Sequence, residues 1–117
     1  MLSFIIEDTA DVVIVNIKGE LHHEKVSELE HVWNEQIRKP ASVIAINCRD
    51  LAFIDSPAIG ALVKFFNEAM KKGKKLVFYD LSPGIKQLFG TSRLERLFQI
   101  TTKREFETQY LNRQGAS

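Results

Sequence analysis

The run from Val12 to Ile17 has large apolar side chains at both odd and even positions, and this pattern restricts the possible folds more than any other. Successive side chains of a strand point to opposite faces of a sheet. A strand that is apolar on both faces must therefore be covered on both sides, as in sheets packed between layers of helices. We predict that this strand is central in its sheet.

Short apolar runs alternate with longer segments of helical periodicity along the 117 residues, a length that suits one domain. Strands that alternate with helices predict a mostly parallel sheet with right-handed crossovers. We therefore expect an α/β fold: a single domain with a mixed, mostly parallel β-sheet of four to five strands and about four helices. The expected strands are residues 2–7, 12–18, 43–46, 75–79 and 97–100.

Four helices are expected between and after these strands. The first covers about residues 24–38 and is stopped by Pro40. The second starts at Pro57 and ends in a basic stretch, in which lysines complement the helix dipole and Gly73 supplies a left-handed cap. Ser82-Pro83 opens a short third helix, and a capping box formed by Thr102 and Glu105 opens the last one. The buried face of the second helix is expected to carry Ile59, Leu62, Val63, Phe66 and Met70.

Composition excludes several classes of function. A net charge of +1 gives no large field, so neither direct nucleic acid binding nor membrane adsorption is favoured. No apolar run is long enough to cross a bilayer, and the amino terminus lacks the features of a signal peptide. Cys48 is the only cysteine, which excludes an internal disulfide. We expect a cytoplasmic protein with no membrane insertion.

Residue patterns for metal binding or catalysis are weak. His22 and His23 are adjacent, so their side chains diverge, and His31 has no ligand partner one helical turn away. Cys48 ends an apolar strand, where a buried, inert thiol is the usual outcome. The glycines are scattered, so no phosphate-binding loop is present. We expect no metal, no cofactor and no enzymatic activity.

Asp55-Ser56-Pro57 is the one local pattern that points to a functional site. Serine before proline suits a helix start, and capping by Ser56 alone explains the pair. Phe53 and Ile54, however, are large apolar residues expected in a loop at the carboxyl end of a strand, where parallel sheets present partner sites. Asp55 adds a carboxylate able to hold a metal ion or a hydroxyl proton.

The segment from Asp50 to Leu62 resembles the central motif of STAS domains, the domains of bacterial anti-sigma-factor antagonists. The family's usual run is Phe-Ile/Met-Asp-Ser-Ser-Gly-Leu-Gly after a buried strand. Gly19-Glu20-Leu21, expected here as a loop before the first helix, is similar to the family's Gly-x-Leu-Asp. Three positions differ from the pattern: His22 replaces an aspartate, Pro57 a serine and Ala58 a glycine.

The resemblance implies a non-enzymatic partner switch. An unphosphorylated antagonist binds an anti-sigma factor that is also a serine kinase, phosphorylation of the motif serine ends the binding, and a phosphatase restores it. Carried over, Ser56 is the phosphoacceptor. The implied partner-binding residues are Glu20, His22, Phe53, Ile54, Asp55, Pro57, Ala58, Ile59 and Gly60.

The resemblance also leaves an alternative open, because His22 stands where the family has an acidic residue. In this alternative the protein is a non-switched STAS adaptor subunit of a signalling assembly or of a lipid-transport complex. The domain is expected to span residues 1–112, with residues 113–117 as a disordered tail, and to be a monomer or a weak dimer.

Overall fold

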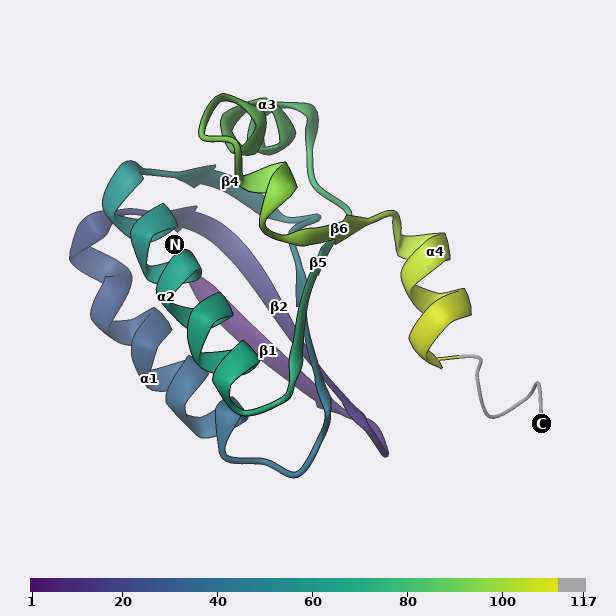
Figure 1. The fold of residues 1–117 in the computed structure, drawn as a ribbon. Helices are drawn as coiled ribbons and strands as arrows, with labels where there is room; N and C mark the ends of the chain where they lie inside the picture. Colours follow the sequence, from purple (N-terminus) through teal and green to yellow (C-terminus); the bar gives the residue numbers. More distant parts are fainter. Residues whose placement is uncertain (112–117) are drawn as a thin grey trace.

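Helices cover both faces of a six-stranded sheet in the computed structural model, which describes residues 1–111 (Figure 1). The expected tail at residues 113–117 lies outside the described residues. The strands are β1 Ser3–Asp8, β2 Val12–Leu21, β3 Val43–Asn47, β4 Leu51–Ile54, β5 Lys75–Tyr79 and β6 Gln99–Thr101. The helices are α1 Val26–Ile37, α2 Ser56–Lys71, α3 Pro83–Thr91 and α4 Lys103–Phe106. Shorter turns are η1 His23–Lys25, η2 Leu94–Arg96 and η3 Glu107–Leu111.

The sheet order is β1-β2-β3-β5-β6, and β4 pairs separately with β2. Among the strands of residues 1–111, only β1 and β2 pair antiparallel; the β2–β3, β3–β5, β5–β6 and β2–β4 pairs are parallel. This arrangement confirms the expected mixed, mostly parallel α/β fold. Strand β2 has neighbours on both sides, as its two apolar faces predict.

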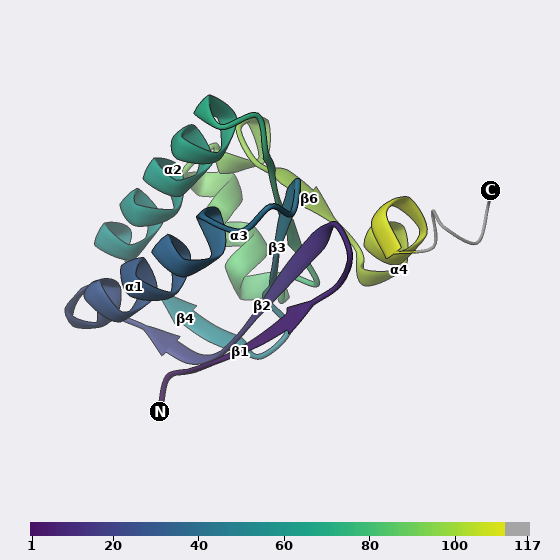
Figure 2. The ribbon, with the colours of Figure 1, turned by 90° about the horizontal axis from the view of Figure 1, so that it is seen from below.

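Alternate residues of β2 divide between two separate cores. Val15 and Ile17 belong to the larger core under α1, α2 and α3. Val12 and Ile14 belong to a smaller core on the opposite face, which Phe106 and its neighbours cover. Figure 2 shows α1 and α2 on one side of the sheet and α4 on the other. A strand with polar residues on one face would leave one of these layers without a partner.

Helix α2 buries Ile59 and Leu62 as expected, and Val63 and Phe66 are partly buried against the larger core, but the centre of the buried stripe is shifted from the expected one. Met70 is 61% exposed, whereas Phe65 is buried and stacks on Trp33 of α1 with ring centroids 4.7 Å apart. The Trp33 ring N–H also donates a 2.8 Å hydrogen bond to Glu68. Because the buried stripe includes small residues such as Ala58 and Ala69, a search for large apolar side chains finds only part of it.

Strand β4 is absent from the sequence prediction, which places Phe53 and Ile54 in a loop and Gly19 to Leu21 in another. Both segments are strands, and they pair in parallel: Gly19 with Leu51, Glu20 with Phe53, and Leu21 with Ile54. The register shifts between Gly19 and Glu20. A four-residue strand has too short an apolar pattern to separate it from a loop. The pairing therefore depends on tertiary context.

Gly19 allows the chain to pass close to its own amino-terminal segment. Its φ is +112°, and a Cβ atom there would lie 2.3 Å from the carbonyl oxygen of Met1. An L-amino acid with a side chain at this position would meet both an unfavourable backbone conformation and a steric clash.

No helix among residues 1–111 is long and apolar enough to span a bilayer.

We expect Gly19→Ala to lower the free energy of unfolding by about 1–3 kcal/mol, the usual cost of a side chain held at positive φ. Gly84→Ala is the matched control, because a Cβ there meets open space within α3. Helix propensity predicts that this control is neutral or slightly stabilising. Urea unfolding followed by circular dichroism measures both variants, and equal losses would contradict the role given to Gly19.

Candidate functional site

The parallel pairing of β2 with β4 brings together two segments that lie far apart in the sequence. The Asp55 backbone N–H extends the ladder by donating to the Leu21 carbonyl at 3.3 Å. The His23 backbone N–H donates to Asp55 Oδ2 at 2.7 Å. Residues at the end of β2 thus contact Asp55 at the start of α2. The predicted site residues at 20–22 and those at 53–60 therefore lie in one region of the fold.

Asp55 caps helix α2. Its Oδ1 accepts a 3.1 Å hydrogen bond from the Ala58 backbone N–H, and Ser56 is the first residue of the helix. The prediction that Ser56 is the cap is therefore wrong. An aspartate one residue earlier satisfies the same backbone donor, and its charge is favourable at the positive end of the helix. Ser82, by contrast, caps α3 as predicted.

Hydrogen bonds also set the ionisation of Asp55, whose side chain is 20% exposed. Partial burial raises the pKa of this carboxyl. Hydrogen bonds from the backbone N–H groups of His23 and Ala58, together with the His23 ring, lower the pKa by more than burial raises it. The net pKa of Asp55 therefore lies below its usual value. Asp55 is therefore a charged structural link between η1 and α2. Both of its oxygens already accept hydrogen bonds within the chain.

The Ser56 side chain does not cap α2 or link it to another element. The residue is exposed, and its hydroxyl makes no hydrogen bond with any of residues 1–111. Pro57 and Gly60 beside it are also exposed. A hydroxyl at the first position of a helix, free of a cap bond and open to solvent, is accessible to a modifying enzyme.

The exposed Phe53 ring contacts the His22 ring, and Phe53 precedes Ser56 by three residues. Phe53 is 44% exposed, and its ring centroid lies 5.0 Å from that of His22. His22 Nε2 lies 2.9 Å from Glu20 Oε1, on the strand residue that pairs with Phe53. The site thus has an exposed apolar centre with a polar margin.

Three of the predicted partner-binding residues are buried. Ile54 and Ala58 are 1% and 0% exposed, and Ile59 is 9% exposed. Their side chains belong to the larger core, so only their backbone could meet a partner. The predicted residues with accessible side chains are Glu20, His22, Phe53 and Pro57, together with Gly60 and the serine.

His23 is the site residue that sequence analysis did not single out. Its main contribution is a backbone N–H, and its ring Nδ1 lies 3.3 Å from Asp55 Oδ2. No local pattern predicts a contact with a residue 32 positions away. A tertiary contact map would be required to find it.

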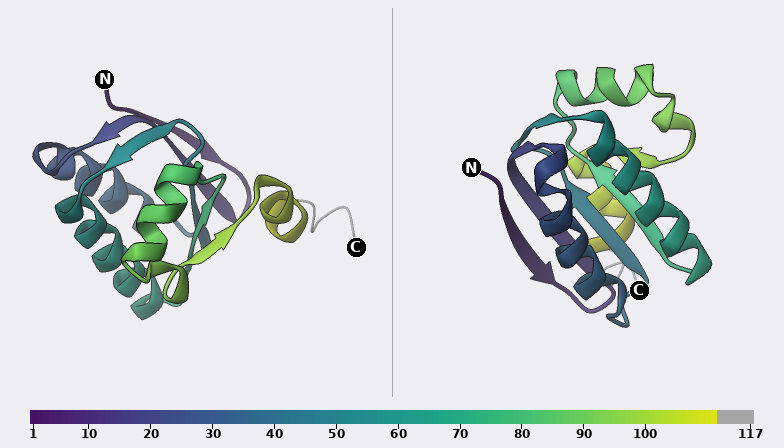
Figure 3. Two further views of the ribbon diagram at one scale, coloured as in Figure 1. Left: turned by 90° about the horizontal axis from the view of Figure 1, so that it is seen from above. Right: turned by 90° about the vertical axis from the view of Figure 1, so that its left-hand side faces the viewer.

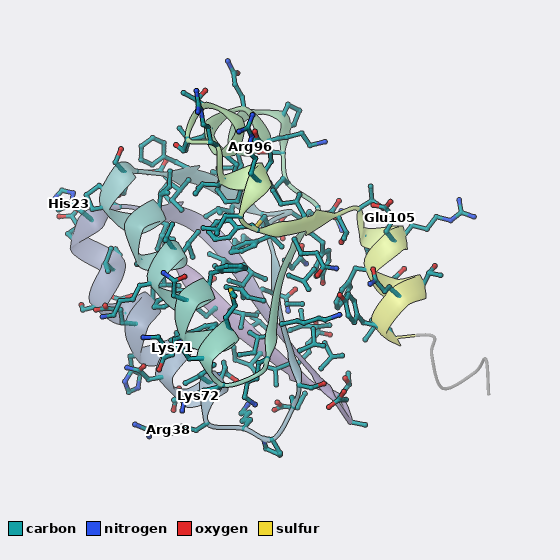
Figure 4. All side chains as sticks on the ribbon, in the orientation of Figure 1. His23, Arg38, Lys71, Lys72, Arg96 and Glu105 are labelled. Atoms are coloured by element: carbon teal, nitrogen blue, oxygen red, sulfur yellow. The ribbon has the colours of Figure 1, made fainter. Side chains whose placement is uncertain are left out.

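The other candidates for chemistry lie elsewhere or are inert. Burial, with a smaller contribution from Asp80, raises the pKa of the Cys48 thiol to about 12. Residues 1–111 contain no group of three His, Cys, Asp or Glu side chains placed to hold a metal ion. Figure 4 shows Lys71 and Lys72 at the opposite end of the helical layer from His23. Lys74 in this basic stretch donates to the carbonyls of Lys39 and Ala41, a structural role.

Asp55→Ala is expected to cost about 0.5–2 kcal/mol of stability at pH 7, the range for loss of a helix cap. Because the folded pKa of Asp55 is lowered, its charge contributes stability above the unfolded pKa of about 4, and this contribution disappears as pH falls through the folded value. The difference from wild type should therefore shrink at acid pH.

Ser82→Ala is the control for this measurement, because it removes an uncharged cap from α3. Its cost should not change over the same pH range. Denaturant unfolding at pH 7 and near pH 3 measures both variants. A pH-independent effect of Asp55→Ala would contradict the charged link.

Comparison with known proteins agrees with this geometry. The STAS domain family model matches residues 3–108. An anti-sigma F factor antagonist from Paenibacillus polymyxa is 27% identical over 90 residues, which cover 76% of this chain and 77% of the relative.

Solved structures show the same fold. Bacillus SpoIIAA in its phosphorylated form is 23% identical, with a TM-score of 0.70 over 92% of this chain and 98% of SpoIIAA. A putative anti-sigma factor antagonist from Thermotoga maritima is 22% identical, with a TM-score of 0.82 over 91% of this chain and 92% of the other. The family model covers almost the whole described structure, and the chain belongs to the STAS domain family.

Proposed function

We propose that this protein is an anti-sigma-factor antagonist that binds an anti-sigma factor/serine kinase through the surface around Ser56, and that phosphorylation of Ser56 ends the binding. The observation that carries the proposal is the free, exposed hydroxyl of Ser56, three residues after the exposed Phe53 ring. The relative from Paenibacillus polymyxa, named an anti-sigma F factor antagonist, supports the choice of partner class.

Phe53 supplies the apolar contact in this proposal. Half-exposed aromatic side chains at the centre of a polar margin are frequent anchors of protein interfaces. Pro57 and Gly60 present no long side chain, so a partner's backbone can approach the first turn of α2. Glu20 and His22 form the polar rim, which contributes more to specificity than to affinity.

Phosphorylation introduces about two negative charges at a place where two of the nearby backbone donors cannot bind them. Pro57 has no backbone N–H, and the Ala58 N–H is already bonded to Asp55. The phosphate would also stand next to the Asp55 carboxylate. The dipole of α2 tolerates an anion at this end, so the helix remains folded while the interface becomes repulsive.

The kinase must supply its own catalytic base. A neighbouring carboxylate could accept the serine proton, but both oxygens of Asp55 are occupied by hydrogen bonds from His23 and Ala58. In kinases an aspartate of the catalytic loop performs this task. Asp55 therefore positions the serine by fixing the start of α2, and the partner carries the chemistry. A phosphatase would return the protein to its binding form.

Incubation with an anti-sigma factor/serine kinase of the source organism and ATP is expected to add one phosphate to the wild-type protein and none to Ser56→Ala. Ser82→Ala is the matched control, because Ser82 also precedes a proline at a helix start but caps its helix. Intact mass and peptide mapping give the site. Modification at another serine would overturn the switch, and an unmodified protein that still binds its partner would indicate the non-switched adaptor.

Phe53→Ala is expected to weaken partner binding by about tenfold or more, as for an aromatic anchor. Met70→Ala removes an apolar side chain of comparable exposure at a distance from the site and should leave affinity unchanged. Titration calorimetry compares the two variants.

Ser56→Asp should also weaken binding, because it places a carboxylate in the contact. Equal affinities for all three variants and wild type would remove this surface from the interface.

A further inference from the structure

Strand β1 leaves one edge of the sheet open. Within the described part of the chain it pairs with β2 alone, through six consecutive residue pairs from Ser3–Lys18 to Asp8–Val13. Figure 3, in its right panel, shows β1 as the outermost strand with no described element beyond it. The outer edge of such a strand presents unpaired backbone donors and acceptors, which favour pairing with another strand.

The usual protections against edge pairing are absent from the middle of β1. The segment Ser3 to Ile6 contains no lysine, proline or glycine, and the pairing with β2 has no bulge along β1. Proteins that keep an edge strand unpaired commonly place such features on it. The charged residues of β1 are confined to its last two positions, Glu7 and Asp8.

Both faces of β1 offer apolar side chains at the open edge. Ile5 is 64% exposed on the face opposite α1. Phe4 and Ile6 are half-buried on the α1 face, where they pack against the margin of the larger core together with Leu2 and Val32. A strand added at this edge would bury apolar surface above and below the sheet.

The charges along the edge are complementary to those of a second copy. Glu7 and Lys18 lie on the same face of the sheet as Ile5, at opposite ends of β1, because Lys18 is the cross-strand neighbour of Ser3. Lys18 makes no ion pair with any of residues 1–111. An antiparallel copy brings its Glu7 opposite Ser3 and therefore next to Lys18, whereas a parallel copy places the acidic ends together.

We propose that β1 pairs with β1 of a second copy of this chain, antiparallel about a two-fold axis through Ile5, to form a homodimer with a continuous sheet. In this register Ile5 faces its own counterpart, and Phe4 faces Ile6 of the second copy on both sides of the axis. Glu7 of each copy lies two strand spacings from Lys18 of the other, about 10 Å between backbones, which two long side chains can bridge. Glu7 Oε2 accepts a 2.8 Å hydrogen bond from Asn16 within its own chain, so the ion pair would use the other carboxylate oxygen or replace this bond. Ser56 and Phe53 are not part of this interface.

Sedimentation velocity over about 10 µM to 1 mM protein tests the dimer. Wild type should move from the 13.4 kDa monomer toward twice that mass as concentration rises. Ile5→Lys places two lysines opposite each other and should raise the dimer Kd by about tenfold or more. Met70→Lys, at a residue 61% exposed away from β1, should leave the Kd unchanged. A wild type that remains monomeric, or a dimer that Met70→Lys disrupts and Ile5→Lys spares, would overturn the proposal.

A charge exchange tests the register itself. Glu7→Lys and Lys18→Glu should each weaken the dimer, because each places like charges across the interface. The double variant restores opposite charges and should recover the wild-type Kd. Additive weakening in the double variant would exclude this register. Ile5→Lys should still be phosphorylated at Ser56, so failure of the dimer and failure of the proposed switch give different results.

Discussion

The continuation of β2 beyond Gly19 is the constraint on which the site depends. At Gly19 the backbone takes a positive φ and passes close to Met1, and after it the strand changes its register and runs alongside β4. This short parallel pair delivers the His23 N–H to Asp55, and Asp55 in turn fixes the start of α2. Glycine at one position thus determines where a serine more than thirty residues later is presented.

The elements that sequence analysis predicts well are those specified by local patterns. The two apolar faces of β2, the capping box of Thr102 and Glu105, and the left-handed cap at Gly73 are all present in the structure. Strand β4 is missed because four residues carry too little periodicity. The cap of α2 is misplaced because Asp55 and Ser56 are both good cap residues, and the choice depends on the His23 N–H, which only the folded chain supplies.

The site residues divide into a scaffold and a contact surface in a way that composition does not reveal. Ile54, Ala58 and Ile59 hold the segment in the larger core, while Phe53, Ser56 and Gly60 remain outside. Phe53 and Ile54 are neighbours in β4 and point to opposite faces of the sheet, and the first turn of α2 directs Ala58 and Ile59 inward. The apolar residues of this segment therefore have two different roles: Ile54 and Ile59 pack in the core, whereas Phe53 is available for recognition.

The smaller core has a consequence for how the chain is made. Val12, Val43 and Val77 on the outer face of the sheet are covered by Phe106 and Tyr110, and Phe106 stacks on Tyr79 at 4.4 Å. Because synthesis proceeds from the amino terminus, all the strands leave the ribosome before this cover does. During that interval the nascent sheet exposes a contiguous apolar face. This face is covered only when the residues of α4 and η3 have been made and have packed against it.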